Sequence, residues 1–254
     1  MERCLIRFCI VATSRSGTSY LATALTGFPK VLCHGEVFHR NVAEHIAAEY
    51  TGALDFDLRE RDPISFVDQI FALKTDLCAA GFKIFRGHND AALAHILADR
   101  EIKKIVLRRE NVLASYSSLL LAIKTGHWQS RPNWVGPRPD CPPDPEAQPM
   151  EPIESKVTFD QAQFKAYWDW ERQTYEYYRG AVIAADGPYL DISYTILTSG
   201  DFCSIERFLD LPPGHHWTSD VEKLNTSDIL DRFYNPREVL EFAREWNVTH
   251  WLQE

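Results

Sequence analysis

Short apolar runs of strand type alternate along the chain with segments of helical periodicity. The first run ends at Ala12, a turn of small and hydroxyl residues follows, and a periodicity typical of a helix resumes at Leu21. The runs that predict strands lie at 8–12, 30–36, 81–86, 103–109 and 188–192. The helical patterns begin at Leu21, occupy parts of 40–73, follow Asn89 or Asp90, lie at about 112–124, 160–183 and 202–211, and follow Pro236. This alternation predicts an α/β fold of three layers, with a central parallel sheet covered by helices on both faces.

Length and composition are those of an ordinary globular protein. The chain has 254 residues, of which 45% are hydrophobic and 25% charged, so we expect a single domain over residues 1–254 with a substantial core. The formal net charge of −9 argues against a general nucleic-acid binder, because such proteins carry a basic surface. A phosphate site in this chain is therefore expected to be local.

The cysteine pattern and the apolar runs bear on the compartment. Six cysteines are scattered without a Cys-x-x-Cys pair, which indicates reduced thiols. No apolar stretch is long enough to span a bilayer, and the first residues lack the features of a signal peptide. We expect a cytoplasmic protein without a membrane span. His and Cys residues with zinc spacing are absent from the sequence, so no metal is expected.

One segment interrupts the alternation. Eight prolines lie between Gly126 and Pro152, where neither strand nor helix periodicity persists. A loop of this length in a compact domain is usually functional, and we expect a lid at about 126–157. An interdomain linker is the competing interpretation. It is disfavoured because few residues remain after the segment to build a second domain.

The turn after the first strand carries the first candidate chemistry. Unpaired N–H groups and the positive end of the dipole at a helix start form an anion site, and Gly17 allows an anion to approach the backbone. Ser16, Thr18 and Ser19 add hydroxyl donors, and Arg15 adds a positive charge. The segment lacks the glycines and the lysine of the nucleoside-triphosphate loop G-x-x-x-x-G-K-S/T.

A second candidate pair follows the fourth predicted strand. Arg109 stands at the carboxyl end of that strand, and Ser117 lies eight residues later on the following helix. Ligands of open parallel sheets bind outside the carboxyl ends of the strands, so Arg109 and the first loop are expected on the same rim. Arginine there can bind a phosphate bidentately, and serine can donate a further hydrogen bond.

Both segments resemble one family. Arg-Ser-Gly-Thr-Ser at 15–19 resembles the 5′-phosphosulfate loop of the sulfotransferases that use 3′-phosphoadenosine 5′-phosphosulfate (PAPS), and Arg109 with Ser117 resembles their 3′-phosphate signature. Residues 107–111 and 125–128 look closest to the bacterial carbohydrate sulfotransferases, including those acting on trehalose and on nodulation factors. Arg15 is a departure, because many cytosolic relatives carry lysine there.

The resemblance implies a P-loop-like sulfotransferase fold and an enzyme that moves a sulfuryl group from PAPS to a hydroxyl of a saccharide or glycoconjugate. It implies adenosine 3′,5′-bisphosphate as the product, with Arg15 contacting both the nucleotide and the transferred group. Relatives of the animal secretory pathway carry a membrane anchor, so a bare catalytic domain favours a bacterial or cytosolic enzyme.

The reaction needs a base, because a hydroxyl attacks sulfur more readily as its proton is removed. Glu36 follows the second predicted strand on the same rim, and the resemblance implies a catalytic glutamate at about this place. His34 and His39 are alternatives, since histidine is an effective base at its ordinary pKa. Lys223, near Asn225, is a further candidate for the nucleotide, and a solvated lysine is its alternative interpretation.

The acceptor is the least defined part of this hypothesis. Aromatic side chains can carry a sugar ring, although at helical spacing they more often belong to a core. They gather in and after the proline-rich segment at Trp128, Trp134, Tyr167, Trp168 and Trp170. A small metabolite or lipid acceptor remains open. So do a kinase-like protein, which would need a magnesium site, and a nucleotide-binding module without catalysis.

Overall fold

A computed structural model describes residues 5–39, 46, 50, 52–73, 76–128, 155–214, 217–219 and 221–254. Most of the predicted lid, residues 129–154, and the aromatic residue Trp134 lie outside these ranges. The lid therefore stays a prediction.

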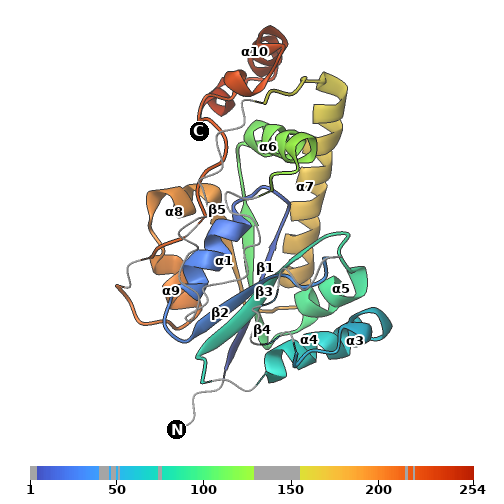
Figure 1. The fold of residues 1–254 in the computed structure, drawn as a ribbon, viewed down its shortest axis with the longest axis vertical. Helices are drawn as coiled ribbons and strands as arrows, with labels where there is room; N and C mark the ends of the chain where they lie inside the picture. The colour runs from blue at the N-terminus through green and yellow to red at the C-terminus, as the bar shows by residue number, and fades with distance from the viewer. Residues whose placement is uncertain are drawn as a thin grey trace.

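A parallel sheet of five strands forms the centre of the molecule, in the order β2-β3-β1-β4-β5 (Figure 1). Every strand pair is parallel. The strands are β1 (Ile6–Ala12), β2 (Val31–Glu36), β3 (Ala79–Phe85), β4 (Ile102–Arg108) and β5 (Tyr189–Ser193). All five were predicted to within two residues at each end. With β1 in the middle and its neighbours reached by crossovers in both directions, the loop after β1 lies at the switch point of the sheet.

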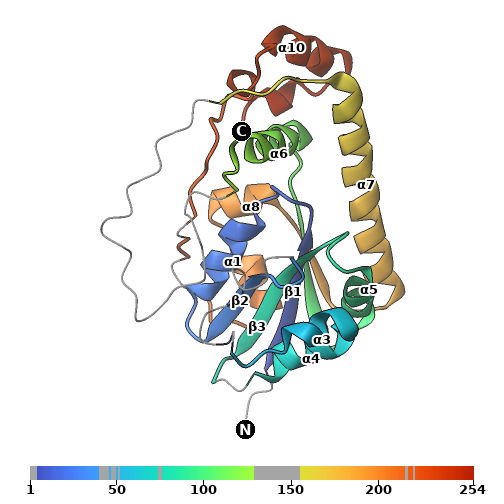
Figure 2. The ribbon, with the colours of Figure 1, turned by 45° about the vertical axis from the view of Figure 1, so that its right-hand side comes forward.

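Helices cover both faces of the sheet, so the predicted α/β class with three layers is confirmed (Figure 2). Side chains of β1 alternate between the faces, because successive residues of a strand point in opposite directions. Cys9 and Val11 pack in the first core cluster with α4 (Pro63–Ala72), α5 (Asp90–Ala98) and α7 (Gln161–Ala184). Phe8, Ile10 and Ala12 pack in the second with α1 (Thr18–Thr26), α8 (Tyr194–Ser199) and α9 (Cys203–Phe208). A further helix, α3 (Phe56–Arg61), precedes α4.

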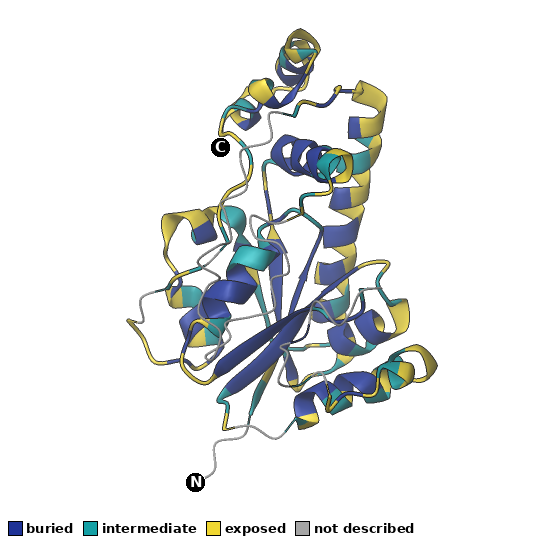
Figure 3. Ribbon diagram, in the orientation of Figure 1, coloured by how far each residue is buried: buried dark blue, intermediate teal, exposed yellow. Residues whose placement is uncertain are grey.

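A third core cluster lies beyond the carboxyl end of the sheet. It joins α6 (Val112–Thr125), the start of α7 and α10 (Pro236–Glu245), and its aromatic centre includes Phe159, Phe164 and Phe242. Figure 3 shows the buried faces of these helices turned toward one another. Two 3₁₀ turns, η2 (Leu230–Arg232) and η3 (Thr249–Leu252), complete the cluster. This arrangement brings the last residues of the sequence over the carboxyl end of β4.

Polar residues at the helix starts act as predicted. The side chain of Asn111 accepts a 2.9 Å hydrogen bond from the Ala114 N–H, and Asn89 does the same for Ala92 N–H. Such caps satisfy N–H groups that the first helical turn leaves unpaired. The short helix α8 was not predicted, because its segment follows β5 without a break and reads as β-branched and apolar.

Candidate active site

The loop from Thr13 to Gly17 connects β1 to α1 as predicted, and it is tightly folded. Arg15 and Gly17 both adopt positive φ angles, of 66° and 91°. The buried hydroxyl of Ser16 donates a 2.6 Å hydrogen bond to the carbonyl of Thr13 and so braces the turn from within. Gly17 is the N-cap of α1, so the N–H groups of the first helical turn face the rim of the sheet. A helix start with this geometry can bind an anion.

Arg15 reaches from this loop across to α6. Its Nε donates a 2.8 Å hydrogen bond to Oγ of Ser118, and its Nη1 donates to the carbonyl of Trp128. Burial, together with the smaller effect of the neighbouring positive charge of Arg109, lowers the pKa of Arg15 to about 10. The guanidinium still carries its charge at neutral pH. Arg15 is therefore a positive charge with little solvent around it, which strengthens its attraction for an anion.

Arg109 follows β4 and lies beside the loop, as the rim argument predicts. Its Nη1 donates a 2.6 Å hydrogen bond to the carbonyl of Arg15, and its guanidinium carbon lies 4.6 Å from the centre of the Tyr194 ring. Ser117, on the second turn of α6, donates a 3.1 Å hydrogen bond to the carbonyl of Ala114. The two residues of the predicted phosphate signature thus come from adjacent elements, β4 and α6.

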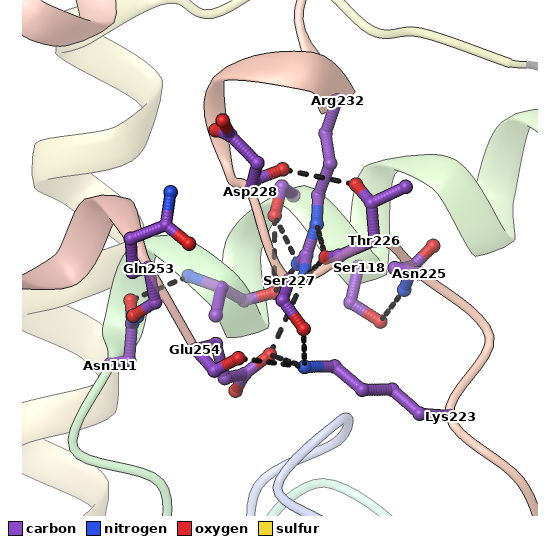
Figure 4. A network of polar contacts seen from close by, with 12 residues as sticks. Asn111, Ser118, Lys223, Asn225, Thr226, Ser227, Asp228, Arg232, Gln253 and Glu254 are labelled. Carbon is purple, nitrogen blue, oxygen red and sulfur yellow. Dashed lines mark hydrogen bonds and ion pairs between the residues drawn. The ribbon is translucent and has the colours of Figure 1, made fainter.

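Three cations, Arg109, Lys223 and Arg232, surround the carboxylate of Glu254 at this place. Figure 4 shows Lys223 and Arg232 beside it. Arg109 Nε lies 2.6 Å from Oε1 of Glu254, and Lys223 Nζ and Arg232 Nη2 each lie 3.4 Å from Oε2. Burial by itself would raise the pKa of Glu254, but Arg109, Lys223 and Arg232 outweigh it and hold that pKa below its ordinary value. The cluster therefore binds an anionic oxygen pair in this structure. That is the donor chemistry that a phosphate requires.

Arg232 joins this cluster to Ser117. Its Nη1 donates a 3.1 Å hydrogen bond to Oγ of Ser117, and its Nε donates to the carbonyl of Thr226. The predicted residue Lys223 donates a 3.1 Å hydrogen bond to Oγ of Ser227, and its side chain is still 37% exposed. Asn225 donates to Oγ of Ser118, the hydroxyl that Arg15 also contacts.

Glu36 lies on the other side of the loop, at the end of β2. The register places it beside Lys83 of β3, and Lys83 Nζ lies 3.4 Å from Oε1 of Glu36 and 3.2 Å from Oγ of Ser19. Nε2 of His88 lies 3.7 Å from the second carboxylate oxygen. Lys83 is only 1% exposed. A buried ammonium group thus links the candidate base to the first turn of α1.

The two alternative bases differ in their surroundings. His34 is 2% exposed, and burial lowers its pKa to about 4. Such an imidazole stays neutral at physiological pH and is a weak base. His39 lies with its ring 6.1 Å from the ring of His88, near the end of β2.

Two tyrosines of α7 form hydrogen bonds with the backbone at the strand ends next to the loop. Tyr178 donates a 3.0 Å hydrogen bond to the carbonyl of Ala12 and accepts one of 2.8 Å from the N–H of Arg86. Tyr175 donates a 2.6 Å hydrogen bond to the carbonyl of Leu107. These hydroxyls satisfy backbone groups at the ends of β1, β3 and β4. They fix the strand ends from which the loop and Arg109 project.

Four residues of the candidate site were not predicted from the sequence: Lys83, Arg232, Ser118 and Glu254. Lys83 carried a usable signal, because it is a lysine inside the otherwise apolar strand 79–85, and a buried charge in such a run needs a partner. Arg232 and Glu254 had no comparable local signal, since Ser117 and Arg109, which they contact on the rim of the sheet, lie more than a hundred residues away in the chain.

Metal-ion sites and membrane-spanning helices are two further features to consider. Among the described residues, no group of three or more His, Cys, Asp or Glu side chains is arranged to hold a metal ion. In the same ranges, no helix has both the length and the apolar character needed to cross a membrane.

Comparisons with known proteins give one kind of match. No family model matches the chain. No curated protein matches it. Among solved structures, the chain is similar to a sulfotransferase from Alicyclobacillus acidocaldarius, with 14% sequence identity over 95% of this chain and 92% of that chain and a TM-score of 0.49.

Proposed function

We propose that this protein is a sulfotransferase that moves a sulfuryl group from PAPS to a hydroxyl of a saccharide or glycoconjugate. One observation carries the proposal. The anion-binding loop lies between a cation cluster, joined to it by the hydrogen bond from Arg109 to the Arg15 carbonyl, and a carboxylate, joined to it through Lys83 and Ser19. Sulfuryl transfer from a bisphosphorylated nucleotide needs these three parts on one rim.

The chain's own residues suit the two anionic ends of such a nucleotide. We assign the 5′ end to the loop residues Arg15, Ser16, Gly17, Thr18 and Ser19, which offer a helix start and a desolvated positive charge. The 3′-phosphate we assign to Arg109, Ser117 and Lys223, together with Arg232. The support for the second assignment is the Glu254 carboxylate, which the same cations already hold.

We assign catalytic roles to residues on both sides of the loop. When bound, the nucleotide supplies the activated sulfuryl group. Glu36 accepts the proton of the acceptor hydroxyl, and Lys83 holds the Glu36 carboxylate in position. Arg15 and the N–H groups at the start of α1 stabilise negative charge that grows on oxygen during transfer. Glu36 is preferred to His34, whose burial makes it a weak base.

A saccharide acceptor is supported by an exposed aromatic residue, Trp128, whose backbone contacts the loop. The carbonyl of Trp128 accepts a hydrogen bond from Arg15, and its side chain is 48% exposed. A solvent-exposed indole beside the transfer site is a suitable face for a sugar ring. Trp168, by contrast, packs against Trp251 with ring centres 4.9 Å apart and belongs to the core. A cytoplasmic location is part of the proposal and rests on the sequence.

Calorimetric titration with adenosine 3′,5′-bisphosphate tests the donor site. We expect the wild-type protein to bind the bisphosphate and to respond little to ATP with magnesium. Arg109→Ala should weaken binding at least about tenfold, because it removes a charge-assisted contact to phosphate. Arg244→Ala, which removes an exposed arginine of α10, is the matched control and should bind as the wild type does. Binding of ATP alone would favour the kinase alternative instead.

Sulfation assays with saccharide acceptors test the base. Glu36→Gln should lower turnover by about a hundredfold or more, since general-base catalysis commonly contributes that much. It should leave bisphosphate binding within about twofold of the wild type, because the carboxylate lies on the other side of the loop from the cation cluster. Unchanged turnover in this variant would remove Glu36 from the mechanism.

A further inference from the structure

Glu254 occupies the place where the proposed nucleotide needs a phosphate. Its carboxylate is in contact with Arg109, Arg232 and Lys223, and the side chain is only 9% exposed. A carboxylate and a phosphate compete for the same donors, because both present anionic oxygens to guanidinium and ammonium groups. The two cannot occupy the cluster together.

The charges in the cluster are unequal. Three cations meet one carboxylate, so the contacts leave an excess of positive charge. A phosphate monoester carries a charge of about −1.5 to −2 near neutral pH and has three acceptor oxygens. It therefore matches the three cations better than the carboxylate does. The Glu254 carboxylate therefore neutralises only part of the positive charge of the cluster.

The segment that carries Glu254 is anchored at Trp251. Trp251 is buried, its ring packs on Trp168, and its carbonyl accepts a 2.9 Å hydrogen bond from the Asn111 side chain. Past this anchor, the backbone is still held: the Gln253 carbonyl accepts a 3.3 Å hydrogen bond from the Asn111 side chain, and Gln253 forms an antiparallel bridge with Asp228. The Glu254 N–H donates a 3.1 Å hydrogen bond to the Ser227 carbonyl, and its carbonyl accepts one of 3.2 Å from Lys223. None of these backbone contacts involves the side-chain carboxylate, so the carboxylate can leave the cations by rotation of the Glu254 side chain, with the backbone in place.

From these contacts we propose that Glu254 is an internal competitor of the nucleotide: its carboxylate holds the cation cluster in the free protein and is displaced when the 3′-phosphate binds. The inference rests on the proposed function, because it takes the cluster as the 3′-phosphate site. It adds that this chain weakens its own affinity for donor and product. A benefit follows for turnover, since the returning carboxylate favours release of the bisphosphate product.

Calorimetric titration of Glu254→Gln tests this directly. The variant keeps the shape of the side chain and removes its charge, so the bisphosphate should bind roughly tenfold more tightly than to the wild type. Adenosine 5′-monophosphate, which lacks the 3′-phosphate, should bind both proteins equally. Glu241→Gln removes an exposed carboxylate from α10 and is the control for net charge; it should match the wild type with either nucleotide.

The outcomes separate the two proposals. Equal or weaker bisphosphate binding by Glu254→Gln, with normal binding by the wild type, would overturn the competitor and leave the donor site intact. A failure of all the proteins to bind the bisphosphate would overturn the donor site, and the competitor with it. An equal gain for the monophosphate would also contradict the competitor, because the effect would not depend on the 3′-phosphate.

A second variant covers the case in which Glu254→Gln does not fold, as judged by circular dichroism. Glu254→Asp keeps the charge and shortens the side chain by one methylene, so its carboxylate reaches the cations less well. We expect it to bind the bisphosphate more tightly than the wild type by a factor smaller than tenfold. Wild-type affinity in this variant would count against the competitor.

Discussion

The ring of Tyr194 lies against Gly17 at the start of α1. A Cβ built on Gly17 would lie 2.7 Å from Cδ2 of Tyr194 and 3.2 Å from Cδ1 of Leu197. Tyr194 also carries the guanidinium of Arg109 on its ring face. The absence of a side chain at residue 17 therefore lets α8 approach the loop and places Tyr194 under Arg109.

Gly17→Ala should destabilise the protein and weaken nucleotide binding. The positive φ alone costs a residue with a side chain about 1–2 kcal/mol, and the contact with Tyr194 adds to that cost. Gly126→Ala is the matched control, because Gly126 also has a positive φ, of 75°, but a Cβ there would meet nothing within 4 Å. Urea unfolding of both variants measures the difference. An equal loss in the two would show that the Tyr194 contact costs nothing.

Lys83→Met should lower turnover much more than it lowers nucleotide affinity. Lys83 is the link between Glu36 and Ser19, and a misplaced catalytic group typically loses about a hundredfold in rate. Lys104→Met is the control, since Lys104 is also fully buried but contacts the Asp99 carbonyl at the amino end of the sheet. Both variants are expected to lose stability. Equal turnover in the two, measured at saturating acceptor, would contradict a role for Lys83 in positioning Glu36.

His34 should make the protein sensitive to mild acid. Its pKa is about 4 in the folded protein, below the ordinary value of 6.5. Between these two pH values the unfolded chain therefore binds a proton that the folded protein does not bind. The stabilisation is complete above pH 6.5 and is lost as the pH falls toward 4, with a total of about 3 kcal/mol.

His34→Gln should flatten this part of the stability curve, as measured by urea unfolding at several pH values. His250→Gln, at an exposed position, should leave the curve unchanged. If the wild type and His34→Gln lose stability in parallel between pH 6.5 and 4, His34 is not the group responsible.

Tyr178→Phe should cost about 1–3 kcal/mol of stability, because it removes the hydroxyl that bonds the buried carbonyl of Ala12 and the partly buried N–H of Arg86. The neighbouring residue Tyr177 is 39% exposed, so Tyr177→Phe is a control of the same chemistry at an adjacent site. Thermal unfolding compares them. A loss confined to Tyr178→Phe is the expected result, and equal stability of the two variants would contradict the role of the Tyr178 hydroxyl.

Much of the fold was predictable because its signals are local. The loop before α1, the cap residue Asn111 and the apolar strands are all encoded within a few neighbouring positions. The presence of a parallel sheet follows from the alternation of these elements. Their order in the sheet does not, since the pairing of β1 with both β3 and β4 depends on how helices pack across the whole domain.

The residues of the candidate site likewise fall into those that local sequence signals predict and those that depend on long-range packing. Arg109 and Ser117 could be placed together because they flank one strand end and the helix that follows it. Arg232 and Glu254 reach the same point from the far end of the chain, carried there by the aromatic packing of α10 and Trp251 against α6 and α7. No spacing rule connects them to Arg109. The roles assigned to all of these residues remain predictions until the titrations are made.

The tyrosines of α7 have a consequence for how the domain opens. Hydroxyls on a single helix join the ends of β1, β3 and β4, so these ends separate from one another only if α7 is lost from the sheet. The strand ends and α7 then form one cooperative unfolding unit, of the kind that native-state hydrogen exchange detects as amides with a common opening free energy. Movements that admit or release a ligand are then expected in parts of the site that lie outside this unit, such as the side chain of Glu254.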